Sequence, residues 1–467
     1  MGPRVSMAPH AAQRLLRGAD ALTPLHATLD GALQRVATEV LRRHLLAVRA
    51  QHVYDGAILV ADNATAEVLA YVAGSGDLSS ARYVDGIQAR RQPGSALKPF
   101  LYGMALEHRL LTAASLLEDT PLDVSVMGGL YRPRNYDERF RGLVTVRTAL
   151  AASLNIPAVR TLELVGAEAF VQQLRHLGFD GVSEAGEYYG PSLALGSVDV
   201  SLWELVSAYR ALAYGGVWSP LHLRATEPGT EAARRVFSEQ TAFLLSHILS
   251  DRGSRSVTFG LENPLATRFW SAVKTGTSKE MRDNWCIGYS RRYTVGVWVG
   301  NLSGEPMRNV SGVTGAAPIW LEVIAWLHRA TPSSPMAPPP GVLATGVTFP
   351  AEVEPGRTEW FLNGTEPRVS LQRLAEGFPR IYTPVSGTVI ALDPDIPPSR
   401  QRLSFEGDAA DLPLRWVLDE QDLGDAVKSL LWEPSPGQHT LSLVDQDRRV
   451  LDTVTFVVRG GAILAGE

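Results

Sequence analysis

The sequence predicts an α+β domain, in which an antiparallel sheet is flanked by helices and an all-helical subdomain, followed by a small all-β sandwich. Three observations favour this fold. Apolar residues recur at helical spacing through most of the chain before Trp270, strand alternation follows, and only strand patterns occur beyond Arg380. The proline-rich stretch 331–350 has the composition of a stiff linker.

These patterns divide the chain into four segments. We expect an N-terminal lead-in and linker helix at 1–45, the main α+β domain at 46–330, a proline-rich linker region at 331–378 and the β-sandwich at 379–467. Within the lead-in, residues 1–27 show little periodicity and are expected to be irregular.

Composition excludes several classes of protein. The 467 residues are 45% hydrophobic and 20% charged, which is ordinary for a globular chain, and the net charge of −5 argues against a nucleic-acid footprint. The single cysteine, Cys286, rules out an internal disulfide and a cysteine-based zinc site. Neither a signal peptide nor an apolar run of about 18 residues is found, so no membrane-spanning helix is expected.

Helices of the main domain follow from apolar residues at helical spacing and from cap residues such as Asp30 and Ser238. The expected helices are 28–45, 95–111, 144–152, 158–164, 167–177, 201–212, 238–250 and 317–328.

Strands of the main domain come from short apolar or alternating runs: a hairpin of 57–62 with 66–72, and an antiparallel set of 271–275, 285–289 and 293–300. In the tail, strands are expected at 388–391, 414–418, 439–444 and 454–458, the last two joined by the turn 445–449. The tail carries no titratable cluster, so we expect no chemistry there.

A serine and a lysine stand at the start of the helix expected from residue 95. Ser95 and Lys98 are three residues apart and share one helix face, an arrangement typical of an activated nucleophile. Pro99 is tolerated in a first turn. By itself the pair also fits an N-capping serine beside a solvated lysine.

Two later motifs strengthen the catalytic interpretation. Ser153, Leu154 and Asn155 lie in a break between helices, which alone would be read as a terminating turn. Lys274, Thr275, Gly276 and Thr277 end a strand, where the glycine lets a substrate approach the backbone. S-x-x-K, S-x-N and K-T-G in this order characterise class A β-lactamases and penicillin-binding proteins.

The chain resembles the transpeptidase region of class A penicillin-binding proteins, most of all those of the penicillin-binding protein 1C type. The likeness extends beyond the motifs to an all-β tail from Arg380 and to five longer blocks. These are TLDGALQ, RQPGSALKPFLYGMALE, YRPRNYDERFRGLVTVRTALAASLNIPAVR, YYGPSLALGSVDVSLWEL and AVKTGTSKEMRDNWCIGYSRRYTVGVWVGN.

The resemblance implies a serine D,D-transpeptidase that acts on peptidoglycan stem peptides ending in D-Ala–D-Ala. Ser95 would attack the penultimate carbonyl, with Lys98 as its general base. Ser153 would relay the proton to the leaving amine, and Asn155 would hold Lys98 and the substrate amide. A nearby positive charge on Lys274 would lower the pKa of Lys98.

Substrate binding and the oxyanion hole follow from the same resemblance. Lys274, Thr275 and Thr277 would bind the terminal carboxylate, and Gly276 would allow its approach. The backbone N–H groups of Ser95 and Thr277 would form the oxyanion hole. No metal or organic cofactor is expected.

The resemblance also sets expectations about partners and place. These are peptidoglycan stems and β-lactams, with cell-wall synthesis proteins at the β-domain and no nucleic acid. Such proteins carry a membrane anchor and a glycosyltransferase domain ahead of this region, so we expect these on a longer form or another chain. The full-length form would act at the periplasmic face of the bacterial inner membrane, while this chain is expected to be soluble.

Three alternatives remain open at this point. A D,D-carboxypeptidase would use water as acceptor in the second step. A β-lactamase would need a deacylating glutamate, and no E-x-x-L-N occurs after the S-x-N motif. A wall-binding or partner-docking module would need no chemistry at all.

Overall fold

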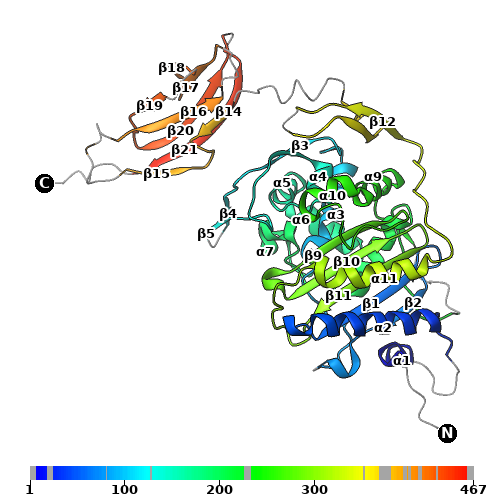
Figure 1. Cartoon of the computed structure of the whole chain (residues 1–467). Helices are drawn as coiled ribbons and strands as arrows, with labels where there is room; N and C mark the ends of the chain where they lie inside the picture. Colours follow the sequence, from blue (N-terminus) through cyan, green and yellow to red (C-terminus); the bar gives the residue numbers. More distant parts are fainter. Residues whose placement is uncertain are drawn as a thin grey trace, which may run out of the picture. The chain divides into compact units, whose positions relative to one another are not determined.

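The structure, a computed structural model, is shown in Figure 1. It describes residues 7–17, 25–79, 81–126, 129–225, 233–350, 353–367, 380–392, 397, 401–408, 413–426, 430–446 and 448–459. The chain forms two compact units, one of Met1–Gly346 with Thr358–Glu366 and one of Val347–Arg357 with Pro367–Glu467. In the described part of the chain, no helix is both long and apolar enough to cross a membrane.

The first unit is built on a five-stranded sheet in the order β2-β1-β11-β10-β9, with every neighbouring pair antiparallel. The predicted hairpin and the predicted strand set are therefore one sheet, joined where β1 pairs with β11. The strands are β1 (Asp55–Asp62), β2 (Val68–Val72), β9 (Ala272–Thr277), β10 (Asp283–Tyr289) and β11 (Tyr293–Gly300).

Both faces of this sheet are covered, because successive strand residues point to opposite sides. On one face, Ile58 and Val60 belong to a hydrophobic cluster with α2 (Gly31–Val48) and α11 (Ala317–Leu327). On the other face, Ala57 and Leu59 belong to a larger cluster that contains the helical subdomain. Figure 1 shows α2 and α11 lying across the sheet.

The helical subdomain surrounds α3, whose residues from Lys98 to Leu106 are all buried and, apart from Lys98, mainly apolar. Local caps fix several helix starts: Asp30 caps α2, Ser238 caps α9, and Ser201 forms a capping box with Glu204. The helices are α3 (Lys98–Glu107), α4 (Val146–Ala151), α5 (Ile156–Val165), α6 (Ala167–His176), α7 (Gly186–Tyr189), α8 (Leu202–Ala213), α9 (Glu239–Ser250) and α10 (Arg252–Phe259).

Short two-stranded sheets connect these helices. They pair β3 (Leu116–Asp119) with β6 (Gly142–Thr145), β4 (Val124–Val126) with β5 (Gly129–Tyr131), and β7 (Val217–Trp218) with β8 (Arg234–Arg235). Their pairing corrects one predicted helix: the helix expected from residue 144 starts at Val146, because Val144 and Thr145 pair with β3.

Three further differences from the expected elements have local causes. The lead-in contains α1 (Pro9–Leu16), where Ala11 is buried and the Arg14 guanidinium lies 4.4 Å from the Trp203 ring centroid. Residues 94–97 form a 3₁₀ turn ahead of α3. This α3 ends at Glu107 rather than near Leu111, since Arg109 takes a positive φ.

A β-hairpin lies where the sequence indicated a linker. Strands β12 (Val342–Val347) and β13 (Arg357–Leu362) pair with each other, and Glu359 of β13 is fully buried. The Glu359 carboxylate accepts hydrogen bonds from Arg147 of α4, one of them 2.6 Å long from Nε. The proline content of this segment predicted a linker. The hairpin is stabilised by an ion pair between Arg147 and Glu359, which lie far apart in sequence, and local composition does not contain such a contact.

The second unit is all-β, as predicted. Its apolar cluster lies around Phe405, Trp416 and Phe456. One sheet has the order β14-β16-β19 and the other β15-β21-β20-β17-β18. The strands are β14 (Arg380–Thr383), β15 (Val389–Ala391), β16 (Leu403–Asp408), β17 (Arg415–Leu418), β18 (Gln421–Asp425), β19 (Leu430–Trp432), β20 (Gly437–Val444) and β21 (Val450–Arg459).

Candidate active site

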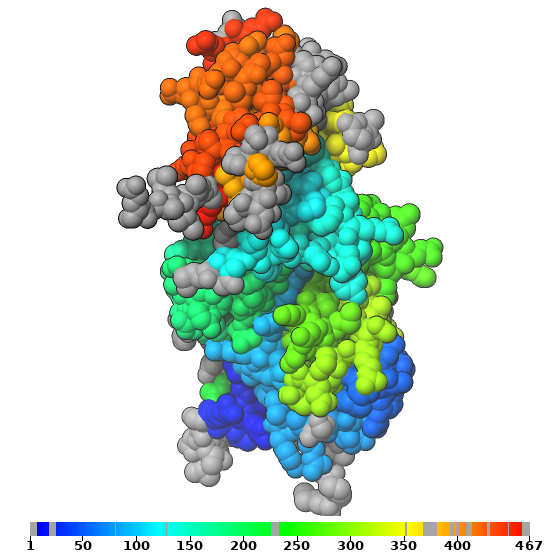
Figure 2. All heavy atoms as spheres, turned by 90° about the vertical axis from the view of Figure 1, so that its left-hand side faces the viewer, coloured from blue at the N-terminus to red at the C-terminus, as the bar shows by residue number. Residues whose placement is uncertain are grey.

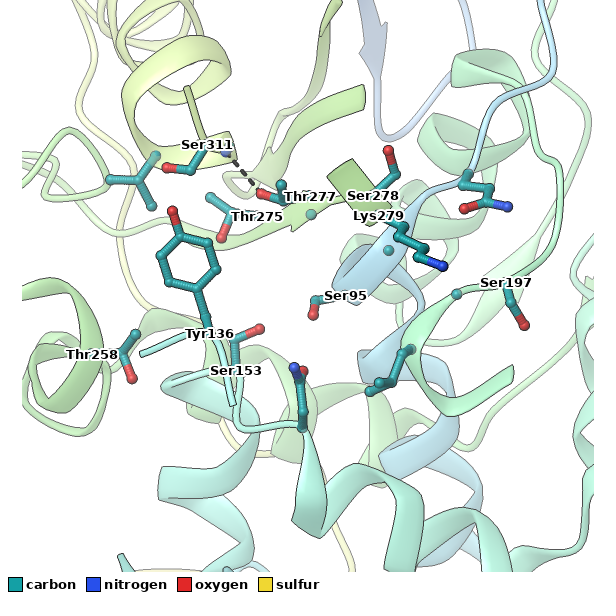
Figure 3. Close-up of a pocket in the computed structure, with 18 of the residues that line it drawn as sticks. Ser95, Tyr136, Ser153, Ser197, Thr258, Thr275, Thr277, Ser278, Lys279 and Ser311 are labelled. Atoms are coloured by element: carbon teal, nitrogen blue, oxygen red, sulfur yellow. Dashed lines mark hydrogen bonds between the residues drawn. The ribbon is translucent and has the colours of Figure 1, made fainter. Parts of the chain in front are cut away.

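A cleft of about 820 Å³ in the first unit brings the three sequence motifs together. Its walls come from the 3₁₀ turn before α3, the α4–α5 junction, the end of β9 and the segment before α11. Blue-to-cyan, green and yellow-green segments, distant in the sequence, adjoin on the face of this unit seen in Figure 2. Figure 3 shows Ser95, Ser153, Thr275 and Thr277 around the cleft.

Two glycines let the serine turn and strand β9 approach closely. A Cβ on Gly94, whose φ is +55°, would lie 2.4 Å from the Thr277 carbonyl oxygen, and one on Gly276 would lie 2.1 Å from the Pro93 carbonyl oxygen. Neither position accommodates a side chain. Glycine is therefore required in the K-T-G motif by the packing of the protein's own backbone, in addition to any approach of a substrate.

Polar side chains from other elements hold the turn in place. The Tyr209 hydroxyl of α8 donates to the Ala96 carbonyl oxygen over 2.7 Å, and Trp285 Nε1 of β10 donates to the Gln92 carbonyl oxygen over 2.8 Å. Ser95 is half-buried, and within the described residues its hydroxyl has no hydrogen-bond partner. The nucleophile candidate is therefore free to meet a ligand in the cleft.

Lys98 is fully buried behind Ser95. Its Nζ donates to the carbonyl oxygens of Ser153 and Leu154, each over 2.8 Å, and to Asn155 Oδ1 over 2.6 Å. Burial, and next the Lys274 charge, lower the pKa of Lys98 well below its usual value. No hydrogen bond joins Lys98 to Ser95 in the described structure, and catalytic contacts commonly tighten only when substrate binds.

Ser153 adopts a left-handed backbone conformation with φ of 64°, which is uncommon for a residue with a side chain. Its hydroxyl accepts a hydrogen bond of 2.7 Å from Lys274 Nζ. Strained conformations of this kind cluster at functional sites, where the surroundings enforce them.

Lys274 is also buried, on strand β9. Burial first, and then the Arg255 guanidinium, lower the pKa of Lys274 to about 7. Its Nζ donates to the Ser153 hydroxyl and to the Thr275 carbonyl oxygen over 2.9 Å. The Cys286 thiol nearby is buried and its pKa is raised, so it is not a reactive thiol.

Asn155 is held from several sides. Its Oδ1 accepts from Lys98, its Nδ2 donates to the Arg134 carbonyl oxygen over 2.7 Å, and its backbone N–H donates to Asn135 Oδ1 over 2.8 Å. Asn135 in turn donates to both carboxylate oxygens of the buried Asp119, over 2.7 and 2.9 Å.

Asp119 and Asn135 were not found from the sequence. The signal was present in the block YRPRNYD, which holds Asn135, but its contact with Asn155 could not be read from spacing. Other residues that line the cleft without having been predicted are Gln92, Tyr136, Ser192, Ser197, Lys279 and Ser311.

The two threonines of strand β9 face the cleft on either side of Gly276. Thr277 Oγ1 accepts a hydrogen bond of 3.1 Å from the Gly312 N–H, while Thr275 is buried. No aspartate or glutamate lines the cleft in the part of the chain that the structure describes. Over the same part, no group of three His, Cys, Asp or Glu side chains could hold a metal ion.

Comparisons with known proteins show which families the chain resembles. The family model "Penicillin binding protein transpeptidase domain" matches residues 56–317, and "Penicillin-Binding Protein C-terminus Family" matches residues 368–456. The chain is 32% identical over 411 residues to Penicillin-binding protein 1C of Escherichia coli (strain K12), covering 84% of the chain and 51% of that protein. It is 30% identical over 369 residues to Penicillin-binding protein 2D of Bacillus subtilis (strain 168), covering 73% and 51%.

Solved structures show the same fold. The penicillin-binding protein PonA1 from Mycobacterium tuberculosis matches with a TM-score of 0.60 at 22% identity, covering 70% of the chain and 94% of that structure. Penicillin-Binding Protein 1A from Haemophilus influenzae matches with a TM-score of 0.59 at 23% identity, covering 68% and 54%. The chain spans about half the length of the curated relatives it matches.

Proposed function

The chain belongs to the penicillin-binding protein transpeptidase family, and from this premise we propose that it is a serine D,D-transpeptidase. Its substrates would be peptidoglycan stem peptides ending in D-Ala–D-Ala, and β-lactams would acylate the same serine. One observation carries the proposal: Ser95, Ser153 and Asn155 line one cleft, and the buried Lys98 and Lys274, both with lowered pKa values, donate to Asn155 and Ser153.

In the first step, neutral Lys98 takes the proton of the Ser95 hydroxyl, and the oxygen attacks the penultimate carbonyl carbon. The backbone N–H groups of Ser95 and Thr277 stabilise the oxyanion, each contributing about 10²–10³ in rate. Ser153 passes its proton to the departing D-Ala amine as the amide bond breaks and takes the proton held by Lys98 in exchange, which leaves an ester on Ser95 and a neutral Lys98. Lys274, Thr275 and Thr277 hold the terminal carboxylate.

In the second step, an amine of a neighbouring stem attacks the ester carbonyl. A new amide bond forms, the Ser95–carbonyl bond breaks, and the proton from the amine returns to the Ser95 oxygen through Lys98. Water in place of the amine would give a D,D-carboxypeptidase. The absence of any acidic side chain along the described cleft removes the usual base for deacylation by water, which favours transfer over a β-lactamase reaction.

The proposal places the reaction at the periplasmic face of the bacterial inner membrane, where a longer form would be anchored. The second unit, which matches the C-terminus family, is proposed to dock cell-wall synthesis proteins.

Labelling with a fluorescent penicillin tests the nucleophile. Wild type and Ser183→Ala, a change at an exposed loop serine, should both become labelled, whereas Ser95→Ala should not. Equal labelling of Ser95→Ala would refute the assignment, and rapid loss of label with release of hydrolysed drug would indicate a β-lactamase.

Incubation with paired stem peptides separates the two second steps. Cross-linked dimers support the transpeptidase, and monomeric tetrapeptide as the sole product would identify a carboxypeptidase.

A further inference from the structure

The catalytic cleft has two sides that differ in chemistry. Ser153 and Thr275 lie on one side of Ser95, and Ser197 and Lys279 lie on the other (Figure 3). The proposed function puts the terminal carboxylate of the donor stem near Lys274 and Thr275. The rest of the donor, attached to the opposite side of the scissile carbonyl, must therefore run toward Ser197 and Lys279.

A second cavity of about 470 Å³ continues the cleft on that side. The two cavities share Gln92, Ser278 and Lys279 as lining residues, so a donor that leaves the first can enter the second. Its charged lining comprises Arg90, Arg91, Lys279 and Arg282 on the cationic side, and Asp199, Glu280 and Asp283 on the acidic side.

Most of these charges are already engaged. Arg282 donates two hydrogen bonds to Glu280, over 2.7 and 3.1 Å. The Asp283 oxygens accept from the Ser278 hydroxyl over 3.0 Å and from Trp298 Nε1 over 3.1 Å. Glu280 is therefore paired with a cation, and the carboxylate oxygens of the buried Asp283 are turned toward Ser278 and Trp298.

Three groups remain unengaged among the residues that the structure describes. Lys279 and Asp199 are exposed, and neither has a hydrogen bond or an ion pair, with the other or with any described residue. Arg91 donates from Nη2 to the Leu302 carbonyl oxygen over 2.8 Å, but its buried Nε has no partner. A buried donor without a partner costs free energy that a bound acceptor would recover.

We propose that this second cavity is a donor-stem subsite that binds a carboxylate through Lys279 and Arg91, which both line it. The inference rests on the proposed function, which sets the direction of the donor. Asp199 lies at the same cavity without a partner of its own, so it opposes the carboxylate and limits its affinity. The subsite therefore selects donors with one free carboxylate upstream of the scissile bond over amidated or cationic ones.

Three penicillins test the subsite because their side-chain amides take the place of the donor stem. Benzylpenicillin, carbenicillin and ampicillin carry a hydrogen, a carboxylate and an ammonium on the same benzylic carbon. The measurement is the second-order rate of Ser95 acylation by each drug. We expect the rates to decrease in the order carbenicillin, benzylpenicillin, ampicillin, with neighbouring members about 2- to 5-fold apart, as exposed charge pairs allow.

Variants at the cavity test whether its charges cause the difference in acylation rate. Lys279→Gln should bring the carbenicillin-to-benzylpenicillin ratio to about 1, and Asp199→Asn should raise that ratio. Arg35→Gln, an exposed change on α2, should leave it at the wild-type value. A ratio of 1 in wild type, or one unchanged in Lys279→Gln, overturns the subsite.

Failure of the subsite differs from failure of the proposed function. If no penicillin acylates Ser95, the transpeptidase proposal fails. If all three acylate Ser95 at equal rates, only the subsite fails. Donor peptides with a side-chain carboxylate or carboxamide give a second measurement: the subsite requires a lower donor KM for the carboxylate, and equal values contradict it.

Discussion

Lys274 Nζ donates a hydrogen bond of 2.7 Å to the Ser153 hydroxyl, while Lys98 Nζ donates one of 2.8 Å to the Ser153 carbonyl oxygen. One serine thus separates two buried amines. Because burial and mutual repulsion both disfavour two positive charges at this place, the pair has states in which at most one lysine is protonated. This relationship supports the proposed roles of Lys98 as a neutral base and of Lys274 as a cationic carboxylate binder.

The first prediction concerns pH. Lys98 must be neutral to act as base, and its lowered pKa makes that form available far below the ordinary lysine value of 10.5. Lys274 must be cationic to bind a carboxylate, and this form is lost as the pH rises through about 7. We therefore expect acylation by benzylpenicillin to show a bell-shaped pH profile with its alkaline limb near neutrality.

Lys274→Arg is the informative variant for that profile, because arginine stays charged. It should remove the alkaline limb while retaining part of the activity. Arg255→Met should instead move the limb to higher pH, since the Arg255 charge lowers the pKa of Lys274. A wild-type rate that keeps rising to pH 10 would contradict the assigned roles.

The second prediction concerns Asp119, which acts on Lys98 through Asn135 and Asn155. Asp119→Asn should lower the acylation rate at least about 10-fold, because Asn155 loses a fixed orientation. The Asp119 charge raises the pKa of Lys98, so its removal should also shift the acid limb of the pH profile to lower pH. Asp123→Asn, at an exposed carboxylate paired with Arg132, serves as control. If the acid limb does not shift in Asp119→Asn, the role of Asp119 is purely structural.

The third prediction concerns the close approach of the serine turn and β9. Gly276→Ala places a Cβ 2.1 Å from the Pro93 carbonyl oxygen, so the strand and the turn must separate. We expect acylation by benzylpenicillin to fall about 100-fold or more, as misplacement of about 1 Å does elsewhere. Gly74→Ala, where a Cβ meets nothing within 4 Å, should retain the wild-type rate. Comparable acylation rates for the two variants would show that acylation does not depend on the close approach of the serine turn to β9.

The fourth prediction concerns the hairpin β12–β13. Glu359→Ala leaves Arg147, only 2% exposed, without its buried partner, and should reduce the free energy of unfolding by about 3–5 kcal/mol. Urea unfolding of the first unit measures the change. Asp77→Ala removes the partner of Arg42, an exposed pair, and should leave the midpoint unchanged. If both variants unfold at the same urea concentration, the buried pair does not stabilise the fold.

The sequence predicted the elements that depend on local signals. Helix α9 begins after Ser238, as its cap residue indicated, and the three strands β9, β10 and β11 lie where alternation placed them. It did not predict α1, which packs through Arg14 on Trp203, or the hairpin that contains Glu359. Those elements are stabilised by contacts with distant residues, which local patterns do not contain.

The sequence by itself predicted which residues carry the proposed chemistry. Ser95, Lys98, Ser153, Asn155 and Lys274 stand in short motifs whose residue types allow few other uses together. In the structure Ser95, Ser153 and Asn155 line one cleft, and both lysines donate hydrogen bonds to residues of that lining. Only the tertiary structure decided how these groups are tuned. The lowered pKa values of both lysines, the left-handed Ser153, the support of Asn155 by Asp119 and the cavity at Lys279 arise where distant segments meet. Desolvation and Coulomb interaction depend on distance and burial, and folding alone sets these.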